Sequence, residues 1–262
     1  MNRSFLVALA ITGIEAQTCP YTATPTNYLD LSGNCEVLLA AMPPMNTDLA
    51  SCNAMPFLAV ALYSSRNYSW QAYSITTPDG YILHMGRIMA NGSGISNWDV
   101  DAGPILFLHG AYGDGLSWFG GSDSNYDSLI ESLYDFQGHD VWIAFQRGTQ
   151  SSLGHTDSTF QARSDGTEAG QTYYENYWNF GADEIAAYDI PEMINMIIAE
   201  RYIQGLSSAK VQIVTATTAA QEALMTLSKY PTSSNDYIAT VINQSPCLIQ
   251  NEAVTMEFFA AN

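Results

Sequence analysis

Residues 210–227, KVQIVTATTAAQEALMTL, constrain the possible folds of this chain more than any other stretch. The stretch opens with the β-branched residues Val211, Ile213 and Val214 and continues through a block of small residues. It then becomes compatible with a helix over 221–228. A β-branched run predicts a buried strand, and the segment after it predicts a helix. The chain is therefore expected to make a sharp strand-to-helix turn near residue 217.

Further apolar runs predict the rest of a sheet. Residues 104–108, PILFL, and 140–145, DVWIAF, are almost continuously apolar, as expected of parallel strands covered on both faces. Residues 72–89 read as two β runs joined by a Pro-Asp-Gly turn at 78–80, which predicts a hairpin. Residues 237–244 supply a sixth strand. This pattern predicts an α/β fold, with a mostly parallel sheet and helices on both faces.

The strand–turn–helix stretch resembles the nucleophile elbow of α/β-hydrolases, where Gly-x-Ser-x-Gly presents a serine on a strained turn. Here the five positions read Thr215, Ala216, Thr217, Thr218 and Ala219. Thr217 occupies the nucleophile position, and neither flanking glycine is present. We therefore expect an intact scaffold with altered chemistry.

Three other stretches resemble the acid lipases, the gastric and lysosomal neutral-lipid esterases. Residues 72–89 resemble the family's Tyr-x-Val-x-Thr-x-Asp-Gly-Tyr-Ile-Leu and its following Arg-Ile. Residues 146–155 resemble its Asn-Ser-Arg-Gly loop, and residues 177–189 resemble its Phe-Trp-x-Phe-x-x-Asp-Glu-Met-Ala-x-Tyr-Asp. The resemblance runs from about residue 63 to 248, the front part of a family member. It implies an α/β-hydrolase-like domain that is truncated after the sixth strand.

The resemblance also implies where the catalytic groups would lie. In the family the residue after His-Gly donates a backbone N–H to the oxyanion hole, which falls here on Ala111, and the residue after the nucleophile is Thr218. The acid and the histidine should follow the nucleophile in the chain. All four histidines, His84, His109, His139 and His155, precede Thr217.

Other residues of the chain are candidates to replace the catalytic histidine and acid. His109 and His155 are expected on loops at the carboxyl edge of the sheet, so either could approach Thr217 as a base. Glu222, downstream of the elbow, is expected to be a solvated helix charge. Arg147 is expected to hold a loop carboxylate or carbonyls. The histidines lack metal-ligand spacing, so neither a metal nor another cofactor is expected.

The composition excludes some partners. The chain of 262 residues suits one domain with a large core. It carries 26 acidic and 8 basic residues, a formal net charge of −18, which argues against binding nucleic acid or anionic lipid. Charged residues make up only 13% of the chain, so the surface is expected to be rich in uncharged polar groups.

The first residues predict export. Residues 1–16 combine an early arginine with an apolar run from Phe5 to Ile14, which is typical of a secretory signal peptide. The alternative is a membrane anchor, but a spanning helix needs about 20 apolar residues. A secreted or cell-surface protein is therefore expected, with the lumen of an acidic endomembrane compartment as the alternative.

Residues 17–62 predict a disulfide-pinned N-terminal extension, followed by the lipase-like domain over 63–262. Four cysteines allow three pairings, and buried free thiols are the alternative; the residues are Cys19, Cys35, Cys52 and Cys247. Three Asn-x-Ser sequons lie after the expected signal peptide and are candidate glycan sites. They begin at Asn67, Asn91 and Asn243, the last in a strand expected to be buried.

Three functions remain open from the sequence. The first is a catalytically inactive, acid-lipase-like secreted glycoprotein that acts as a structural, assembly or binding subunit. The second is a neutral-lipid ester hydrolase whose acid and histidine lie on a separate chain. The third is a lipid carrier. Ending the sheet at its sixth strand would leave an open edge near residues 240–244, so a protein partner there is expected, either a second copy or another subunit.

Overall fold

The computed structural model describes residues 69–89, 103–111, 113–119, 129–131, 133, 138–206 and 210–246. Several predictions concern residues outside these ranges. They are the signal peptide, the extension over 17–62, the four cysteines and the sequons at Asn67 and Asn91. Among the described helices, none is both long and apolar enough to cross a membrane.

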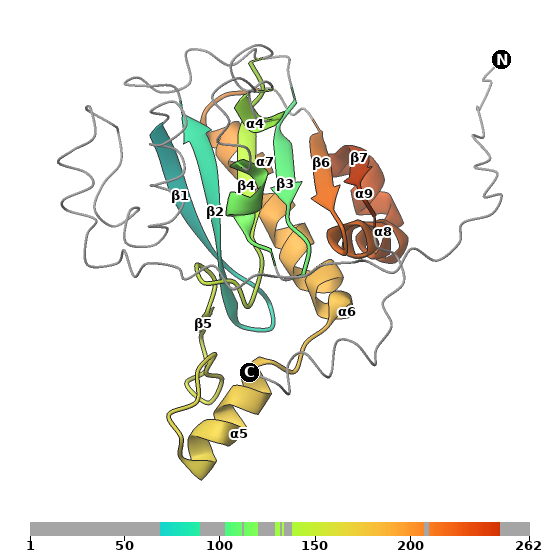
Figure 1. The fold of residues 1–262 in the computed structure, drawn as a ribbon. Helices are drawn as coiled ribbons and strands as arrows, with labels where there is room; N and C mark the ends of the chain where they lie inside the picture. Colours follow the sequence, from blue (N-terminus) through green and yellow to red (C-terminus); the bar gives the residue numbers. More distant parts are fainter. Residues whose placement is uncertain are drawn as a thin grey trace.

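The described residues form a mixed sheet whose strand order is β1-β2-β4-β3-β6-β7, with β5 pairing beside β2 (Figure 1). The strands are β1 Ser69–Thr76, β2 Tyr81–Met89, β3 Ile105–Leu108, β4 Val141–Phe145, β5 Gly154–His155, β6 Val211–Ala216 and β7 Ile238–Gln244. β4, β3, β6 and β7 run parallel, whereas β1, β2 and β4 pair antiparallel. The mostly parallel α/β sheet is therefore confirmed.

The predicted hairpin joins β1 to β2. Thr76 lies opposite Ile82, and Gly80 adopts a positive φ of 99°, which a glycine tolerates without strain. The Thr77 hydroxyl oxygen accepts the Tyr81 N–H at 2.9 Å and closes the turn. The Pro-Asp-Gly sequence thus sets the register of the first two strands.

Helices cover both faces of the sheet. One face packs on α7, Ile190–Ile203, through a cluster that includes Leu106 of β3 and Met193 of α7. The other face is covered by the short 3₁₀ helix η2, Gly115–Phe119, where the Trp118 ring lies 5.0 Å from the Phe107 ring. Beside η2 lies α4, Leu129–Glu131. Figure 1 shows α4 and α7 on opposite sides of β4.

Residues 182–203 form one composite helix. It consists of α6, Ala182–Glu184, a π-helical turn η4, Ile185–Asp189, and α7. The Ile190 N–H bonds to the Ile185 carbonyl, which is the i→i+5 pattern of a π turn. The wider turn leaves Asp189 fully buried at its end.

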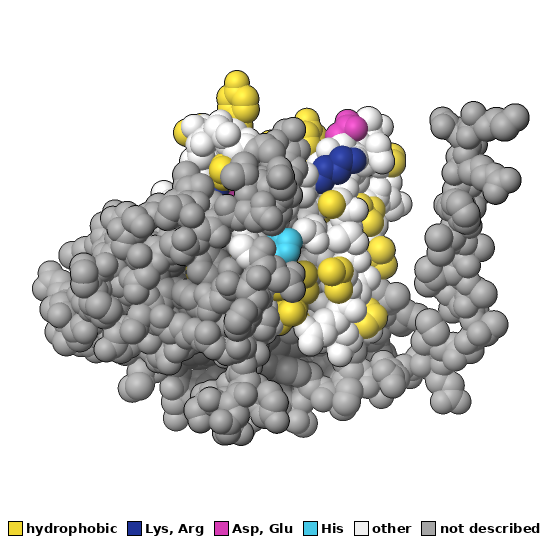
Figure 2. Space-filling view, turned by 90° about the horizontal axis from the view of Figure 1, so that it is seen from above, with side chains coloured by type: hydrophobic (Ala, Val, Ile, Leu, Met, Phe, Trp, Pro, Cys, Tyr) yellow, Lys and Arg dark blue, Asp and Glu magenta, His cyan; other side chains and the backbone are white. Residues whose placement is uncertain are grey.

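The remaining helices are α5 Glu168–Tyr177, α8 Ala219–Lys229 and α9 Pro231–Tyr237. α5 projects away from the sheet, whereas α8 lies beside β6 (Figure 1). Few charged side chains are visible among the described residues in Figure 2, in keeping with the charge-poor composition.

β7 corrects one expectation. The predicted strand is present, but only Ile238 of its seven residues is buried, and Ile242 is 52% exposed. The reason is position: within the described residues β7 pairs with β6 alone and forms an edge of the sheet. Asn243, expected in a buried strand, is therefore exposed.

Candidate functional site

Thr217 occupies the turn between β6 and α8, at the carboxyl edge of the sheet. Its φ is 49°, in the left-handed region that β-branched residues avoid. Such a conformation costs on the order of 1–3 kcal/mol and persists only where the surroundings impose it. Part of that constraint is the Thr217 N–H, which donates to the Gln244 carbonyl at 3.1 Å. The predicted strained elbow is present.

The loop after β3 lies directly against this elbow. A Cβ added at Gly110 would overlap the Thr217 hydroxyl oxygen and would lie 2.8 Å from the Ala216 carbonyl. Gly110 therefore has to be glycine because the elbow approaches its backbone so closely. The sheet thus places the loop after β3 against the turn after β6, and in α/β-hydrolases these two loops form the active site.

The first and last elbow positions carry side chains where the α/β-hydrolase pattern has glycine. Thr215 is fully buried on β6, and its hydroxyl donates to the Asn243 Oδ1 atom on β7 at 2.7 Å. Ala219 is fully buried at the start of α8. The crossing thus accommodates a β-branched residue by turning its hydroxyl toward the neighbouring strand.

The two predicted oxyanion-hole residues meet, but through a side chain. The Ala111 N–H donates to the Thr218 hydroxyl oxygen at 2.6 Å. The backbone donor that the resemblance assigns to a substrate carbonyl is therefore already bonded within the protein.

His109 adjoins Gly110, yet neither ring nitrogen is available to Thr217. Its Nε2 atom accepts the Gln146 N–H at 3.1 Å, so the proton sits on Nδ1, which donates to the Gly110 carbonyl at 3.0 Å. Burial lowers the pKa of His109 to about 4, which keeps the ring neutral. His109 is thus fixed as a neutral structural histidine.

His155 is held elsewhere too. Its Nε2 atom donates to the Asp79 carbonyl at 3.0 Å, and its Nδ1 atom accepts the Asp157 N–H at 2.9 Å. The ring stacks on Phe160, with centroids 4.2 Å apart. Both histidines considered as substitute bases are therefore engaged away from the Thr217 hydroxyl.

Glu222 corrects the sequence interpretation, because it is buried and not solvated. Only 5% of the residue is exposed, and its Oε2 atom accepts the Gln146 side-chain amide at 2.6 Å. Burial, together with the nearby Asp189 charge, raises the pKa of Glu222 to about 7. A buried acid thus lies on α8, in contact with the residue whose backbone holds His109.

Arg147 holds carboxylates, as predicted. Its guanidinium bonds to Asp189 of η4 and to Asp79 of the β1–β2 turn, at 3.0 and 2.8 Å, and lies 3.9 Å from the centre of the Tyr81 ring. Although burial opposes it, these bonds raise the pKa of Arg147. The ion pairs tie the loop after β4 to the hairpin and to the composite helix.

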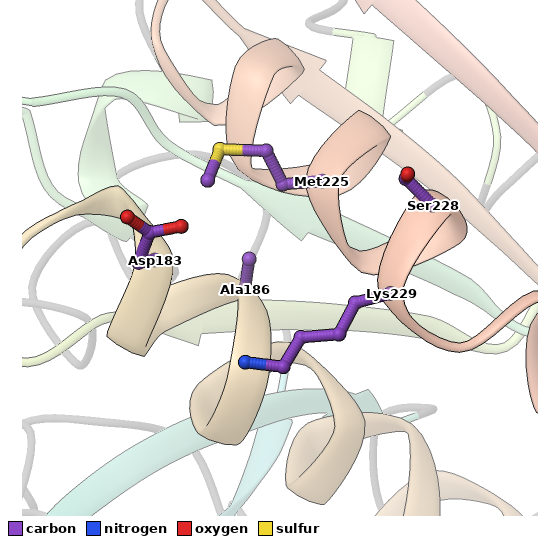
Figure 3. Close-up of a pocket in the computed structure, with 5 residues that line it drawn as sticks. All are labelled: Asp183, Ala186, Met225, Ser228 and Lys229. Carbon is purple, nitrogen blue, oxygen red and sulfur yellow. The ribbon is translucent and has the colours of Figure 1, made fainter.

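A shallow pocket lies between α6, η4 and α8, with a volume of about 220 Å³. Five residues line it, with Asp183 and Lys229 reaching in from opposite helices in Figure 3: Asp183, Ala186, Met225, Ser228 and Lys229. None of them belongs to the elbow. Across the described part of the chain, no group of three or more metal-ligating side chains is present.

The parallel strands, the strained strand-to-helix turn and the Gly110 loop against it define an α/β-hydrolase fold. Residues 59–121 match the family model of the partial alpha/beta-hydrolase lipase region. The resemblance to the acid lipases is confirmed over about half to two-thirds of the chain. The chain therefore has an α/β-hydrolase-like fold and is similar to the acid lipases over this part of its length.

Several relatives show the extent of this similarity. Triacylglycerol lipase 2 of Arabidopsis thaliana is 30% identical over 175 residues, which is 66% of this chain and 35% of the relative. A putative lysosomal acid lipase/cholesteryl ester hydrolase of Crotalus adamanteus is 34% identical over 134 residues, which is 51% of this chain and 29% of the relative. The chain thus spans about a third of the length of these curated relatives.

Among solved structures, an esterase of Pyrococcus furiosus overlaps with a TM-score of 0.44 at 16% identity. The overlap covers 84% of this chain and 63% of the esterase.

Proposed function

We propose that this lipase-like protein does not hydrolyse esters by itself and acts as a binding or assembly subunit. The observation that carries the proposal is the state of His109, whose two ring nitrogens are both bonded to backbone groups. A hydroxyl nucleophile needs an imidazole to take its proton, and losing triad members costs on the order of 10⁴- to 10⁶-fold in rate. The Thr217 hydroxyl receives no such help from the described histidines.

The setting that we propose follows from the relatives. Relatives named as lysosomal acid lipases support secretion or residence in the lumen of an acidic compartment. The raised pKa of Glu222, about 7, is consistent with a protein that works at acidic pH. Glycans at Asn67, Asn91 and Asn243, and disulfides among the four cysteines, belong to the same proposal.

The proposed partner is a second polypeptide that pairs with the outer edge of β7. Among the described residues β7 pairs with β6 alone, so its other edge has no strand partner in this part of the chain. Ile242, 52% exposed, would add apolar contact. Size-exclusion chromatography with light scattering should find a dimer or a complex, and a stable monomer in the absence and presence of cell extract would contradict this.

The test of inactivity is an assay with p-nitrophenyl butyrate. The purified protein should show no turnover above that of Thr217→Ala. Thr172→Ala, an exposed threonine of α5, is the matched control for the substitution. Turnover that Thr217→Ala abolishes and Thr172→Ala preserves would overturn the proposal.

A second candidate is an ester hydrolase whose acid and histidine come from a partner chain. The observation that favours it is the strain at Thr217, with φ at 49°, because such strain is often retained at functional sites. Esterase activity that appears only when a co-purified partner is present, and is lost in Thr217→Ala, would establish this candidate. Lipid carriage stays a prediction, which native mass spectrometry of the purified protein can check.

A further inference from the structure

The Thr218 side chain forms a hydrogen bond that is unusual for its position at the start of a helix. Thr218 is the N-cap of α8, where a threonine hydroxyl ordinarily accepts an N–H from the first turn of its own helix. The Thr218 side chain makes no such capping bond. Its oxygen accepts instead the Ala111 N–H, across from the loop after β3, at 2.6 Å.

This bond is short and partly buried, because its acceptor Thr218 is buried whereas Ala111 is exposed. Hydrogen bonds from an amide N–H to an oxygen are usually about 2.9–3.0 Å long. The 2.6 Å between the Ala111 nitrogen and the Thr218 oxygen is therefore shorter than usual. Thr218 is 8% exposed. Because a backbone amide has one proton to donate, a second acceptor can bind there only after the hydroxyl has moved away.

We propose that the Thr218 hydroxyl occupies the oxyanion position of the elbow, as an autoinhibitory contact that closes the site to a substrate carbonyl oxygen. The inference deepens the proposed function, on whose assignment of the elbow it rests. It adds a block that acts before any proton transfer. Restoring a base to Thr217 would therefore not by itself restore binding of an ester carbonyl.

The test follows the Ala111 amide by ¹⁵N NMR in the intact protein, with octanoate as the probe of an acyl oxygen. In the native protein the Ala111 amide should exchange slowly with solvent and should not respond to octanoate. Thr218→Val keeps the branched shape and removes the acceptor, so amide exchange should accelerate about fivefold, the equivalent of one ordinary hydrogen bond. Its Ala111 signal should then shift saturably with octanoate.

Two further variants keep the test decisive. Thr218→Ser retains the hydroxyl and should behave as the native protein does. Thr218→Ala removes it with less steric change and replaces Thr218→Val if that variant fails to fold. A native Ala111 amide that exchanges like a free loop amide, or that responds to octanoate as the valine variant does, would overturn the inference.

Different experimental results would refute the closed oxyanion position and the proposed lack of esterase activity. Thr217-dependent ester turnover by the native protein would refute inactivity, whatever the Ala111 amide does. An unprotected Ala111 amide in a protein without turnover would refute the closed oxyanion position and leave the inactivity in place.

Discussion

Glu222 of α8 lies buried against Gln146, whose side-chain amide donates to its Oε2 atom at 2.6 Å. Asp189, paired with Arg147, is the charged group that also acts on Glu222. Because Gln146 directly follows β4, its bond to Glu222 connects α8 to the end of β4. The Gln146 N–H also bonds to the His109 ring, which extends the connection to the loop after β3. Burial therefore favours the protonated carboxyl of Glu222 at pH values below about 7.

Acidification should therefore stabilise the fold through Glu222. Its pKa is raised from 4.5 to about 7, so the folded state holds a proton that the unfolded state releases between these values. The free energy of unfolding should fall as pH rises from about 4.5 to 7, by on the order of 3 kcal/mol from this group. Because the lowered pKa of His109 contributes an opposite slope over part of this range, urea denaturation has to compare the native protein with a variant that lacks the Glu222 carboxyl.

Glu222→Gln isolates that contribution. The variant keeps a neutral side chain at every pH, so the free energy of unfolding of the native protein should fall relative to that of the variant as pH rises from about 4.5 to 7. Glu175→Gln, at an exposed position of α5, should keep the native slope. Equal slopes for Glu222→Gln and the native protein would show that Glu222 does not titrate as its burial implies.

Arg147 should be one of the most sensitive positions for stability. Arg147→Met leaves Asp189 buried and unpaired, and breaking a buried ion pair costs about 3–5 kcal/mol. Arg163→Met, an exposed site, should change the free energy of unfolding by less than about 0.5 kcal/mol. Combining Arg147→Met with Asp189→Asn should recover part of the loss, and no recovery would mean that the charge is not the cause.

Thr217→Gly should stabilise the protein despite the flexibility of glycine. Relief of a left-handed β-branched residue is worth about 1–2 kcal/mol, against an entropic cost of about 0.5–1 kcal/mol for glycine. The net gain should be roughly 0.5–1 kcal/mol in urea denaturation. Thr172→Gly, in α5, relieves no strain and should lose stability, so a loss at both positions would contradict a strained elbow.

Gly110→Ala tests the contact between the β3 loop and the elbow. The added Cβ overlaps the Thr217 hydroxyl and lies 2.8 Å from the Ala216 carbonyl, so a loss of several kcal/mol is expected. In the Thr217→Gly background only the carbonyl contact remains, and the loss should be smaller. A double-mutant cycle with zero coupling would place the two residues apart.

Local turn chemistry explains what could be predicted from the sequence. The Pro-Asp-Gly turn and the apolar runs each determine their own structure, so the hairpin, the central strands and the elbow at Thr217 were all accessible. These features depend on neighbours in the sequence or on a pattern of residue types. For Arg147 the sequence predicted a carboxylate or carbonyl partner, but it did not identify Asp79 and Asp189 as the partners.

The rest depends on distant pairs. Glu222 bonds to Gln146, which lies 76 positions away in the sequence. Without knowledge of that contact, an acidic residue on a helix is predicted to face solvent. The Thr218 bond to Ala111 spans 107 positions and depends on one side-chain rotamer. The exposure of β7 depends on what lies beyond an edge strand, which the apolar pattern of residues 238–244 does not encode.

We propose that the Thr217 hydroxyl at the elbow has no histidine as a proton acceptor among the described residues. An alkyl phosphonofluoridate, which forms an adduct only with an activated hydroxyl, tests it by intact-mass spectrometry and peptide mapping. We predict no adduct on Thr217 under conditions that fully label an active serine esterase. An adduct mapped to Thr217 and absent from Thr217→Ala would contradict the account.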